Sequence, residues 1–316
     1  IFTTDLKHAV INSDIIFICV GTPTKKNGYS ADLKYVFQVA KELKKSIKKY
    51  KIIITKSTVP VSTGDKIENI LKNLKKRKLV DVVSNPEFLR EGEAIRDFIY
   101  PDRVVIGTDS KKAIKILKSL YLPIIKKTSR FFNTSRRGAE LIKYASNAFL
   151  ATKISYINEL ANLCEKTGVD IKDVSAGMGL DQRIGERFLR AGPAYGGSCF
   201  PKDTRAIVDT ASSFKANLSI IKSVIKSNNE RKLLLTKRVE KILNNKIKNK
   251  NITFLGVTFK PNTDDMREAS SLFMIPRLHR KGANIKYFDP SGKKINFDKL
   301  KNVNFCNNIS LACLKS

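Results

Sequence analysis

A short segment of the chain, residues 196–203, holds one cysteine in a setting that could support covalent chemistry. Two glycines precede Ser198-Cys199, so a substrate could approach the backbone closely. Lys202 follows three residues after the cysteine and Asp203 follows four residues after it. A thiol attacks carbon as the thiolate, which a nearby cation favours. Taken alone, the segment also fits a buried, inert cysteine beside a glycine turn, which is the commoner situation.

Composition narrows the classes of protein to consider. The 316 residues suffice for about two domains, and a hydrophobic content of 42% supports real cores. The five cysteines are scattered without a CxxC pair, and there are two histidines. We therefore expect no disulfide framework, no metal site and a reducing, cytoplasmic compartment. No apolar run approaches the roughly 18 residues of a membrane span, and no signal peptide is recognisable, so we expect no membrane association.

The net charge of +31 raises the question of a nucleic-acid partner. The lysines are spread along the chain, at 44–45, 48–49, 75–76, 126–127 and 246–250. Aromatic residues do not alternate with them, and no DNA- or RNA-reading motif accompanies them. We predict solvated lysines on helix faces and no nucleic-acid partner. The charge would instead attract an anionic small substrate.

The first part of the chain alternates short β-branched runs with helical patterns. Strands are expected at 15–20, 51–56, 79–84 and 103–106, and helices at 32–49 and 63–76. This alternation is typical of an α/β fold with a parallel sheet covered on both faces. Ligands bind such sheets beyond the carboxyl ends of the strands, where the turns at 21–24, 57–60 and 85–87 would lie.

The pattern then changes twice. One long helix is expected from Arg136 to about Lys166, followed by a helix–turn region at 169–189, the cysteine loop and more helix to about Leu243. Strands at 252–257, 285–288 and 303–306, with a helix at 270–281, form a second α/β unit. No GxGxxG follows a strand, although a dinucleotide fold carries that loop after its first strand. Since the first residue is Ile and the second sheet is short, we expect the natural chain to extend beyond both ends.

Further polar residues accompany the expected ligand edge. Glu87 and Glu91 are four residues apart, one turn if that segment is helical. Lys143 and Asn147 are also four apart and share a face of the long helix. Such a lysine is as often a surface charge with a buried stem, but aimed into a cleft the pair would stabilise a developing oxyanion. Covalent carbonyl chemistry needs a nucleophile, oxyanion donors and carboxylates, and Cys199, Lys143, Asn147, Glu87 and Asp203 supply them.

Eight motifs carry a resemblance to a known family. They are FICVGTP at 17–23, KSTVP at 56–60, SNPEFLREG at 84–92, PDRVVIG at 101–107, ELIKYASNA at 140–148, GGSCFPKD at 196–203, GVTFK at 256–260 and DMREAS at 265–270. Their types and order along the chain resemble the UDP-glucose/GDP-mannose dehydrogenase family. Met266 stands where the family motif usually has a small residue.

The resemblance implies oxidation of a sugar C6 alcohol to a carboxylate with two NAD and one water. It implies that Cys199 forms a thiohemiacetal and then a thioester, which water hydrolyses. The implied roles of the other catalytic residues are oxyanion stabilisation by Lys143 and Asn147, positioning of water by Asp203, proton transfer by Glu87, and a place near the reacting centre for Thr58.

The resemblance also implies two binding sites. The NAD site would be lined by Val20, Gly21, Thr22, Pro23, Thr24, Ser57, Thr58, Val59, Glu91, Lys202 and Arg267, with Arg267 suited to the pyrophosphate. The sugar-nucleotide site would be lined by Glu87, Phe88, Leu89, Arg90, Glu91, Lys143, Asn147, Arg183, Phe188, Leu189, Tyr195, Gly196, Phe259 and Lys260. The long helix would build a homodimer, with Arg183 reaching across it.

The implied fold has three parts. Residues 1–128 would form a partial Rossmann-like NAD-binding domain, 129–235 a central helical dimerisation domain with the cysteine, and 236–316 a second Rossmann-like domain for the UDP-sugar. Within the family we favour UDP-glucose because of the Glu91-Gly92 pair and residues 101–107. The alternatives are GDP-mannose, a UDP-N-acetylhexosamine, a chain without catalytic activity, or a basic nucleic-acid-binding protein with steeply salt-dependent affinity.

The absence of the glycine-rich loop leads to a prediction for these 316 residues. We expect the chain to retain a sugar-nucleotide half-site but to bind NAD weakly, because that loop cradles the pyrophosphate. Isothermal titration calorimetry with NAD measures this directly. A micromolar dissociation constant would contradict the expectation.

Overall fold

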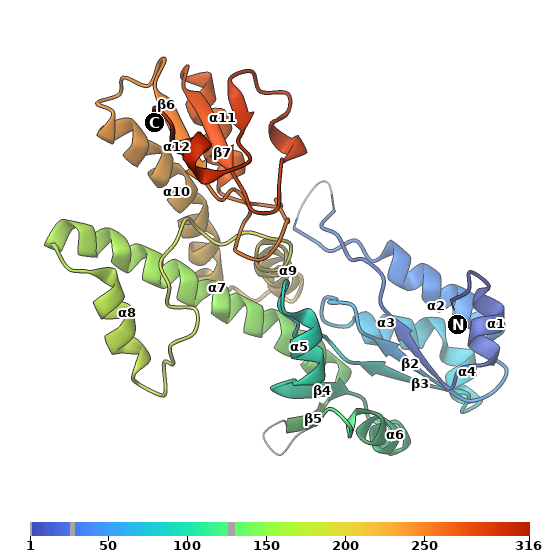
Figure 1. Cartoon of the computed structure of the whole chain (residues 1–316). Coiled ribbons are helices and arrows are strands. Elements are labelled where there is room, and N and C mark those ends of the chain that lie inside the picture. The colour runs from blue at the N-terminus through green and yellow to red at the C-terminus, as the bar shows by residue number, and fades with distance from the viewer. Residues whose placement is uncertain (1, 26–28, 126–129) are drawn as a thin grey trace. The chain divides into compact units, whose positions relative to one another are not determined.

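The computed structural model describes residues 2–25, 29–125 and 130–316 (Figure 1). The chain divides into two compact units: unit 1 comprises Ile1–Ser146 with Arg205–Ala216, and unit 2 comprises Asn147–Thr204 with Asn217–Ser316. Lys126 and Lys127, part of one predicted lysine run, lie outside the described residues. Among the described helices, none is long and apolar enough to cross a membrane.

Unit 1 is built on a five-stranded sheet of order β1-β2-β3-β4-β5. Its strands are β1 (Ile15–Ile18), β2 (Lys51–Thr55), β3 (Val80–Ser84), β4 (Arg103–Gly107) and β5 (Arg130–Thr134). β1, β2 and β3 run parallel, as do β4 and β5, but β3 meets β4 antiparallel through Ser84 and Gly107. The expectations of a wholly parallel sheet and of a strand set ending at 103–106 were therefore wrong. β5 is an edge strand with no fully buried residue, so its sequence lacks a continuous apolar run.

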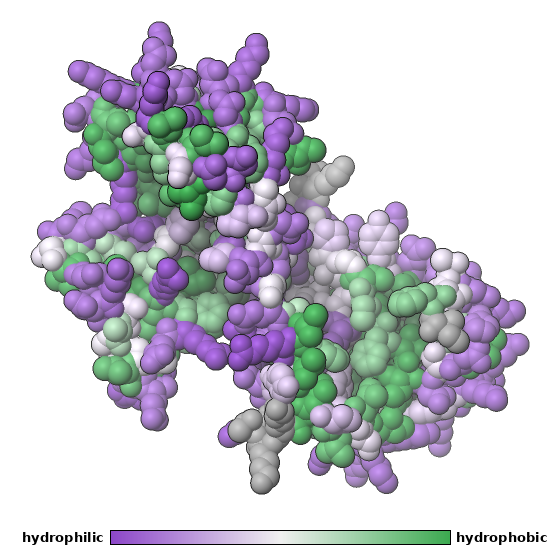
Figure 2. Space-filling view, viewed as in Figure 1, coloured by the Kyte–Doolittle hydropathy of each residue, from purple (hydrophilic) through white to green (hydrophobic). Residues whose placement is uncertain are grey.

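Helices cover both faces of this sheet, as the sequence predicted. β2 is buried throughout, and its side chains alternate between the two faces. Ile53 packs on the side of α1 (Leu6–Ile11), α2 (Lys34–Ser46), α3 (Thr63–Ile70) and α4 (Lys72–Lys76), whereas Ile52 and Ile54 pack against α6 (Lys111–Tyr121). The single helix expected at 63–76 is interrupted at Leu71. A short helix, α5 (Ala94–Ile99), exposes apolar side chains that form a hydrophobic patch in Figure 2.

The long helix was predicted correctly, since α7 runs over Arg136–Thr167. It is followed by α8 (Ile171–Gly179), α9 (Cys199–Ser213) and α10 (Ser219–Ile242). Cys199 is the first residue of α9, so the predicted cysteine loop is a loop only up to Ser198 and its second half is helical. The cysteine therefore occupies a helix N-terminus.

Unit 2 ends in a second, three-stranded parallel sheet of order β6-β7-β8. Its elements are β6 (Asn251–Leu255), α11 (Ser271–Arg280), β7 (Asn284–Phe288), η1 (Ile295–Phe297), β8 (Val303–Phe305) and α12 (Ile309–Cys313). The core here includes Ile275, Ile285, Tyr287 and Met266. Met266, which departs from the family motif, is thus accommodated as a buried apolar side chain.

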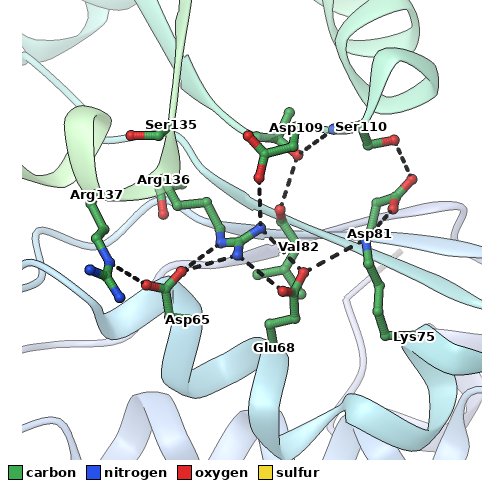
Figure 3. A network of polar contacts seen from close by, with 12 residues as sticks. Asp65, Glu68, Lys75, Asp81, Val82, Asp109, Ser110, Ser135, Arg136 and Arg137 are labelled. Carbon is green, nitrogen blue, oxygen red and sulfur yellow. Dashed lines mark hydrogen bonds and ion pairs between the residues drawn. The ribbon is translucent and has the colours of Figure 1, made fainter.

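A network of charged side chains fixes the start of α7 to α3 in unit 1 (Figure 3). The Arg136 guanidinium lies 3.0 Å from both Asp65 and Glu68, one turn apart on α3. Arg137 pairs with the second oxygen of Asp65. These hydrogen-bonded pairs hold the pKa of Asp65 below its ordinary value, against the opposing effect of burial. The network therefore orients the first turn of α7 on the sheet.

One turn further along α7, Glu140 makes a buried contact with the same helix. Its side chain is 2% exposed. Its carboxylate accepts hydrogen bonds from the N–H groups of Ser62 (2.8 Å) and Gly64 (2.7 Å), at the N-terminus of α3, and from the Ser84 hydroxyl (2.9 Å). A Cβ at Gly64 would lie 2.9 Å from the Glu140 carboxylate, so this close approach requires glycine. Glu140 thus caps α3 and joins it to the end of β3.

Burial raises the pKa of Glu140 from 4.5 to about 7, although its three donors oppose the rise. Because the pKa of Glu140 is higher in the folded chain than in the unfolded chain, folding is accompanied by proton uptake at Glu140 between pH 4.5 and about 7. The associated stability is present below pH 4.5 and is lost as pH rises through about 7, a loss of roughly 3 kcal/mol.

We expect Glu140→Gln to abolish this pH dependence, because glutamine does not titrate. Urea unfolding of parent and variant between pH 4.5 and 8 measures the effect as the difference in unfolding free energy. Glu42→Gln, which removes a carboxylate hydrogen-bonded to Gln38 on α2, is the control. An equal pH dependence in parent and Glu140→Gln would refute the assignment.

Candidate active site

In unit 1, the predicted cofactor turns lie together at the carboxyl ends of β1 and β2. The Ser57 hydroxyl donates to the Val20 carbonyl (2.6 Å), and the Thr22 hydroxyl donates to the Thr58 carbonyl (2.8 Å). Thr24 forms an isolated bridge with Ala31. Apart from its two chain neighbours, no described residue has an atom within 4 Å of the position that a Cβ on Gly21 would occupy. The turns thus present backbone groups and hydroxyls next to open space, which fits a bound dinucleotide.

The segment after β3 is held to α7 by an ion pair. Lys143 is 3% exposed and its ammonium lies 3.2 Å from Oε1 of Glu87. The other oxygen of Glu87 accepts the N–H of Leu89 at 2.6 Å. The Lys143 ammonium also lies 5.4 Å from the centre of the Phe88 ring, and the Arg103 guanidinium lies 4.1 Å from it. Four predicted residues of this site therefore meet within unit 1.

Glu87 and Glu91 do not lie on one helical turn, which they would do if that segment were helical. Residues 85–90 are irregular, and α5 begins only at Ala94. Pro86 disfavours a helical conformation at the preceding residue. Arg90, a predicted substrate residue, forms a bidentate pair with Asp97 (2.6 and 3.0 Å). That pair folds the segment back onto α5.

Lys56 is a site residue that the sequence reasoning missed. Its ammonium donates to Oδ1 of Asn85 at 3.1 Å, and the Tyr121 hydroxyl donates to the same oxygen. Asn85 in turn donates to the Val105 carbonyl at 2.8 Å. Burial lowers the pKa of Lys56 to about 8, against the opposing effect of Glu87. The position of Lys56 in the KSTVP motif, directly before Ser57, was the available signal.

A small pocket of about 10 Å³ lies between these elements of unit 1. Its lining residues are Thr55, Ser57, Val59, Ser84, Pro86, Glu140 and Lys143. The Thr55 hydroxyl is buried and has no hydrogen-bond partner within the described chain. Val59 is buried and belongs to the core of unit 1. Hydroxyl and charged side chains are thus among the residues that line this pocket near the ends of the strands, where ligands bind in such sheets.

In unit 2, Cys199 is exposed at the N-terminus of α9. The Ser198 hydroxyl lies 3.6 Å from its sulfur. The N-terminus of a helix carries partial positive charge and free N–H groups, which favour negative charge on a bound group. The buried cysteine that a lone thiol would suggest is thus excluded here.

Asp203 lies one turn into α9 and is 1% exposed. Its Oδ2 accepts a hydrogen bond from the Asn147 amide at 2.6 Å, and its Oδ1 lies 2.8 Å from the Lys202 ammonium. Lys202 thus has a carboxylate partner, whereas the sequence reasoning considered it as a cation beside Cys199. Asn147 is 8% exposed and couples α7 to α9 through Asp203.

The glycines before Cys199 are tightly packed. Gly197 has φ +75°, and a Cβ there would lie 2.7 Å from the Phe259 ring. A Cβ at Gly196 would lie 2.9 Å from the side chain of Phe259 and 2.7 Å from the Glu268 carbonyl. Both positions therefore require glycine, and Gly196 and Phe259, two predicted substrate residues, lie in contact.

An aromatic cluster adjoins the same loop. Phe200 makes edge-to-face contacts with Phe188 and with Tyr195, each at 6.1 Å between ring centres. Phe188 has φ +67°, which marks a tight turn. Leu189 is 2% exposed, so its side chain belongs to the interior, although it was predicted to line the substrate site.

Three predicted cations of unit 2 lie in more open surroundings. Arg183 is exposed and pairs with Asp181, two residues earlier. Arg267 pairs with Asp265 in the same manner, at 2.8 Å. The Lys260 ammonium lies 5.7 Å from the Phe259 ring centre. Arg267 and Lys260 flank the glycine contacts described above, whereas Arg183 follows α8.

Family models match three consecutive stretches of the chain. Residues 1–125 match the NAD binding domain of the UDP-glucose/GDP-mannose dehydrogenase family, 137–230 its central domain, and 253–316 its UDP binding domain. The β1 and β2 turns lie in the first stretch, Lys143 and Cys199 in the second, and Arg267 in the third.

Curated proteins and a solved structure resemble the chain over nearly its whole length. It is 47% identical to UDP-glucose 6-dehydrogenase of Rhizobium meliloti (strain 1021), over 92% of this chain and 67% of that protein. It is 44% identical to UDP-glucose 6-dehydrogenase of Rickettsia felis, over 99% of this chain and 69% of that protein. The structure of a UDP-glucose dehydrogenase from Pyrobaculum islandicum matches with a TM-score of 0.90 and 36% identity, over 97% of this chain and 71% of that one. The chain, which spans about two thirds of these relatives, therefore belongs to the UDP-glucose/GDP-mannose dehydrogenase family.

Proposed function

We propose that this chain carries the catalytic part of a UDP-glucose 6-dehydrogenase, which oxidises UDP-glucose to UDP-glucuronate. One observation carries the proposal: an exposed Cys199 at a helix N-terminus, followed one turn later by a buried Asp203 that Asn147 holds. Relatives that are 44–47% identical bear that name. A related dehydrogenase for GDP-mannose or a UDP-N-acetylhexosamine is the alternative.

The proposed reaction proceeds through covalent intermediates on Cys199. The thiolate adds to the C6 aldehyde, which is the product of the first oxidation, and forms a thiohemiacetal. Oxidation of that adduct yields a thioester. Water then attacks the acyl carbon, the carbon–sulfur bond breaks, and the carboxylate product and the free thiol result.

The polar residues take the remaining roles. Lys143, kept in place by Glu87, stabilises the oxyanion that forms at the sugar carbon, and Asn147 assists it. Glu87 accepts protons, with Thr58 near the reacting centre. Asp203, whose orientation the Asn147 amide fixes, positions the hydrolytic water. The positive end of α9 favours the charge that develops next to Cys199.

The cofactor would be held by the turns after β1 and β2, namely residues 20–24 and 57–59, with Glu91, Lys202 and the Arg267 guanidinium. When bound, NAD supplies the acceptor for hydride from the sugar carbon. The Arg267 side chain offers planar donors that match a pyrophosphate. The UDP-sugar would be bound by residues 87–91, Lys143, Asn147, Arg183, Phe188, Tyr195, Gly196, Phe259 and Lys260.

We further propose domain limits at 1–128, 129–235 and 236–316, and a homodimer through α7. On the part of α7 in unit 2, Phe149, Tyr156 and Leu163 are more than half or about half exposed and recur every seven residues. This spacing sets them on one side of the helix, as for an interhelical seam. The five free thiols favour a reducing, cytoplasmic location.

Substrate choice is tested with the full-length natural protein. NADH formation is followed with UDP-glucose, GDP-mannose and a UDP-N-acetylhexosamine as substrates. We expect a kcat/KM for UDP-glucose that exceeds the others by at least tenfold and a yield of two NADH per sugar. A preference for another sugar nucleotide would establish the alternative.

The covalent mechanism is tested by Cys199→Ser in the same protein. An oxygen ester resists hydrolysis, so we expect overall turnover to fall by roughly 10³-fold or more while UDP-glucose binding persists. Cys313→Ser, which alters another exposed thiol in unit 2, should leave turnover unchanged. Undiminished four-electron turnover in Cys199→Ser would eliminate the mechanism.

A further inference from the structure

A buried lysine in unit 2 has no place in the proposed chemistry. Lys232 lies on α10, is 1% exposed, and its ammonium lies 3.2 Å from Oε2 of Glu268. The ammonium also lies 4.5 Å from the centre of the Phe273 ring. Burial of a lysine is costly unless the charge is paired, so this ion pair is a strong constraint on where Glu268 lies.

Glu268 itself has an unusual backbone. Its φ is +55°, in the left-handed region that glutamate rarely adopts. Such a conformation persists only where surrounding contacts hold it. The ion pair with Lys232 is one such contact, and it fixes the course of the segment that contains Glu268.

That segment, residues 267–270, packs directly on residues 193–197, which lead to Cys199. The Gly197 N–H donates to the Arg267 carbonyl at 2.8 Å. The Ser270 hydroxyl donates to the Pro193 carbonyl at 2.5 Å. The Glu268 carbonyl occupies the space where a Cβ on Gly196 would lie. These three contacts, made by residues 267, 268 and 270, link the position of Glu268 to that of the cysteine loop.

The same helix holds the loop a second time. Asn228 lies one turn before Lys232, and its side chain is hydrogen-bonded to both the N–H (2.8 Å) and the carbonyl (3.0 Å) of Tyr195. Arg231 donates to the Gly192 carbonyl at 3.1 Å. One face of α10 therefore holds the loop directly, through the hydrogen bonds of Asn228, and indirectly, through the ion pair between Lys232 and Glu268.

We propose that Lys232 and Glu268 are positioning residues that hold the loop at 193–198, and thereby set the place of the Cys199 thiol at the start of α9. The inference rests on the proposed catalytic role of Cys199. It also couples the cysteine to Arg267, the neighbour of Glu268 that would contact the pyrophosphate. Neither Lys232 nor Glu268 takes part in the chemistry itself.

Hydrogen exchange at the loop tests the proposal without any cofactor. In the present chain, Lys232→Met and Glu268→Asn should each speed exchange of the Gly197 amide by at least about tenfold. Asparagine tolerates the left-handed backbone but is too short to reach Lys232, so it separates the ion pair from the backbone conformation. Lys226→Met, which removes an exposed partner of Glu230 on the same helix, is the matched control and should leave exchange unchanged.

The double variant should resemble either single variant, because both remove one shared interaction. In the full-length protein, kcat should fall at least about tenfold in both single variants and recover largely in Lys232→Arg. Unchanged exchange at Gly197, additive effects in the double variant, or an undiminished kcat would each overturn the proposal. Undiminished turnover in Cys199→Ser would instead overturn the proposed function. The exchange rate of the Gly197 amide does not depend on that function, so the two failures can be told apart.

Discussion

Three polar side chains buried along α7 constrain the rest of the structure. Glu140, Lys143 and Asn147 are spaced by three and four residues, so they follow one face of the helix, and each is less than a tenth exposed. A buried polar group that lacks a partner costs several kcal/mol, so each demands a specific neighbour. Those neighbours are the N-terminus of α3, Glu87 and Asp203, and the last two are themselves predicted catalytic residues.

Much of this arrangement followed from local patterns. The strands at β1, β2 and β3, the full length of α7 and the shared face of Lys143 and Asn147 are all consequences of residue periodicity. The edge strand β5 was not predicted, because its exposed and half-buried residues form no continuous apolar run. The break at Leu71 in the helix predicted at 63–76 was not foreseen, because both halves continue a helical pattern of apolar residues.

Other features depended on tertiary contacts that no spacing reveals. Lys56 gains its lowered pKa through burial in the folded chain, where its ammonium donates to the side chain of Asn85. The burial of Leu189 likewise results from packing in the fold. Its sequence neighbours, Phe188 and Arg190, are equally compatible with a leucine that lines a binding site. The exposure of Cys199 was the decisive fact, because the local sequence favoured a buried thiol.

The contact between Glu140 and Gly64 has a consequence for how this protein can change in evolution. The two positions are 76 residues apart in the chain, yet the carboxylate occupies the space of the absent side chain. A larger residue at 64 would also come within 2.9 Å of the Ser84 hydroxyl and 3.1 Å of the Arg136 side chain, so several neighbours would have to shift. Loss of the acid at 140 would leave the end of α3 without its acceptor. Replacement of Gly64 should therefore require compensating changes at several positions far apart in the chain, which favours retention of both Gly64 and Glu140.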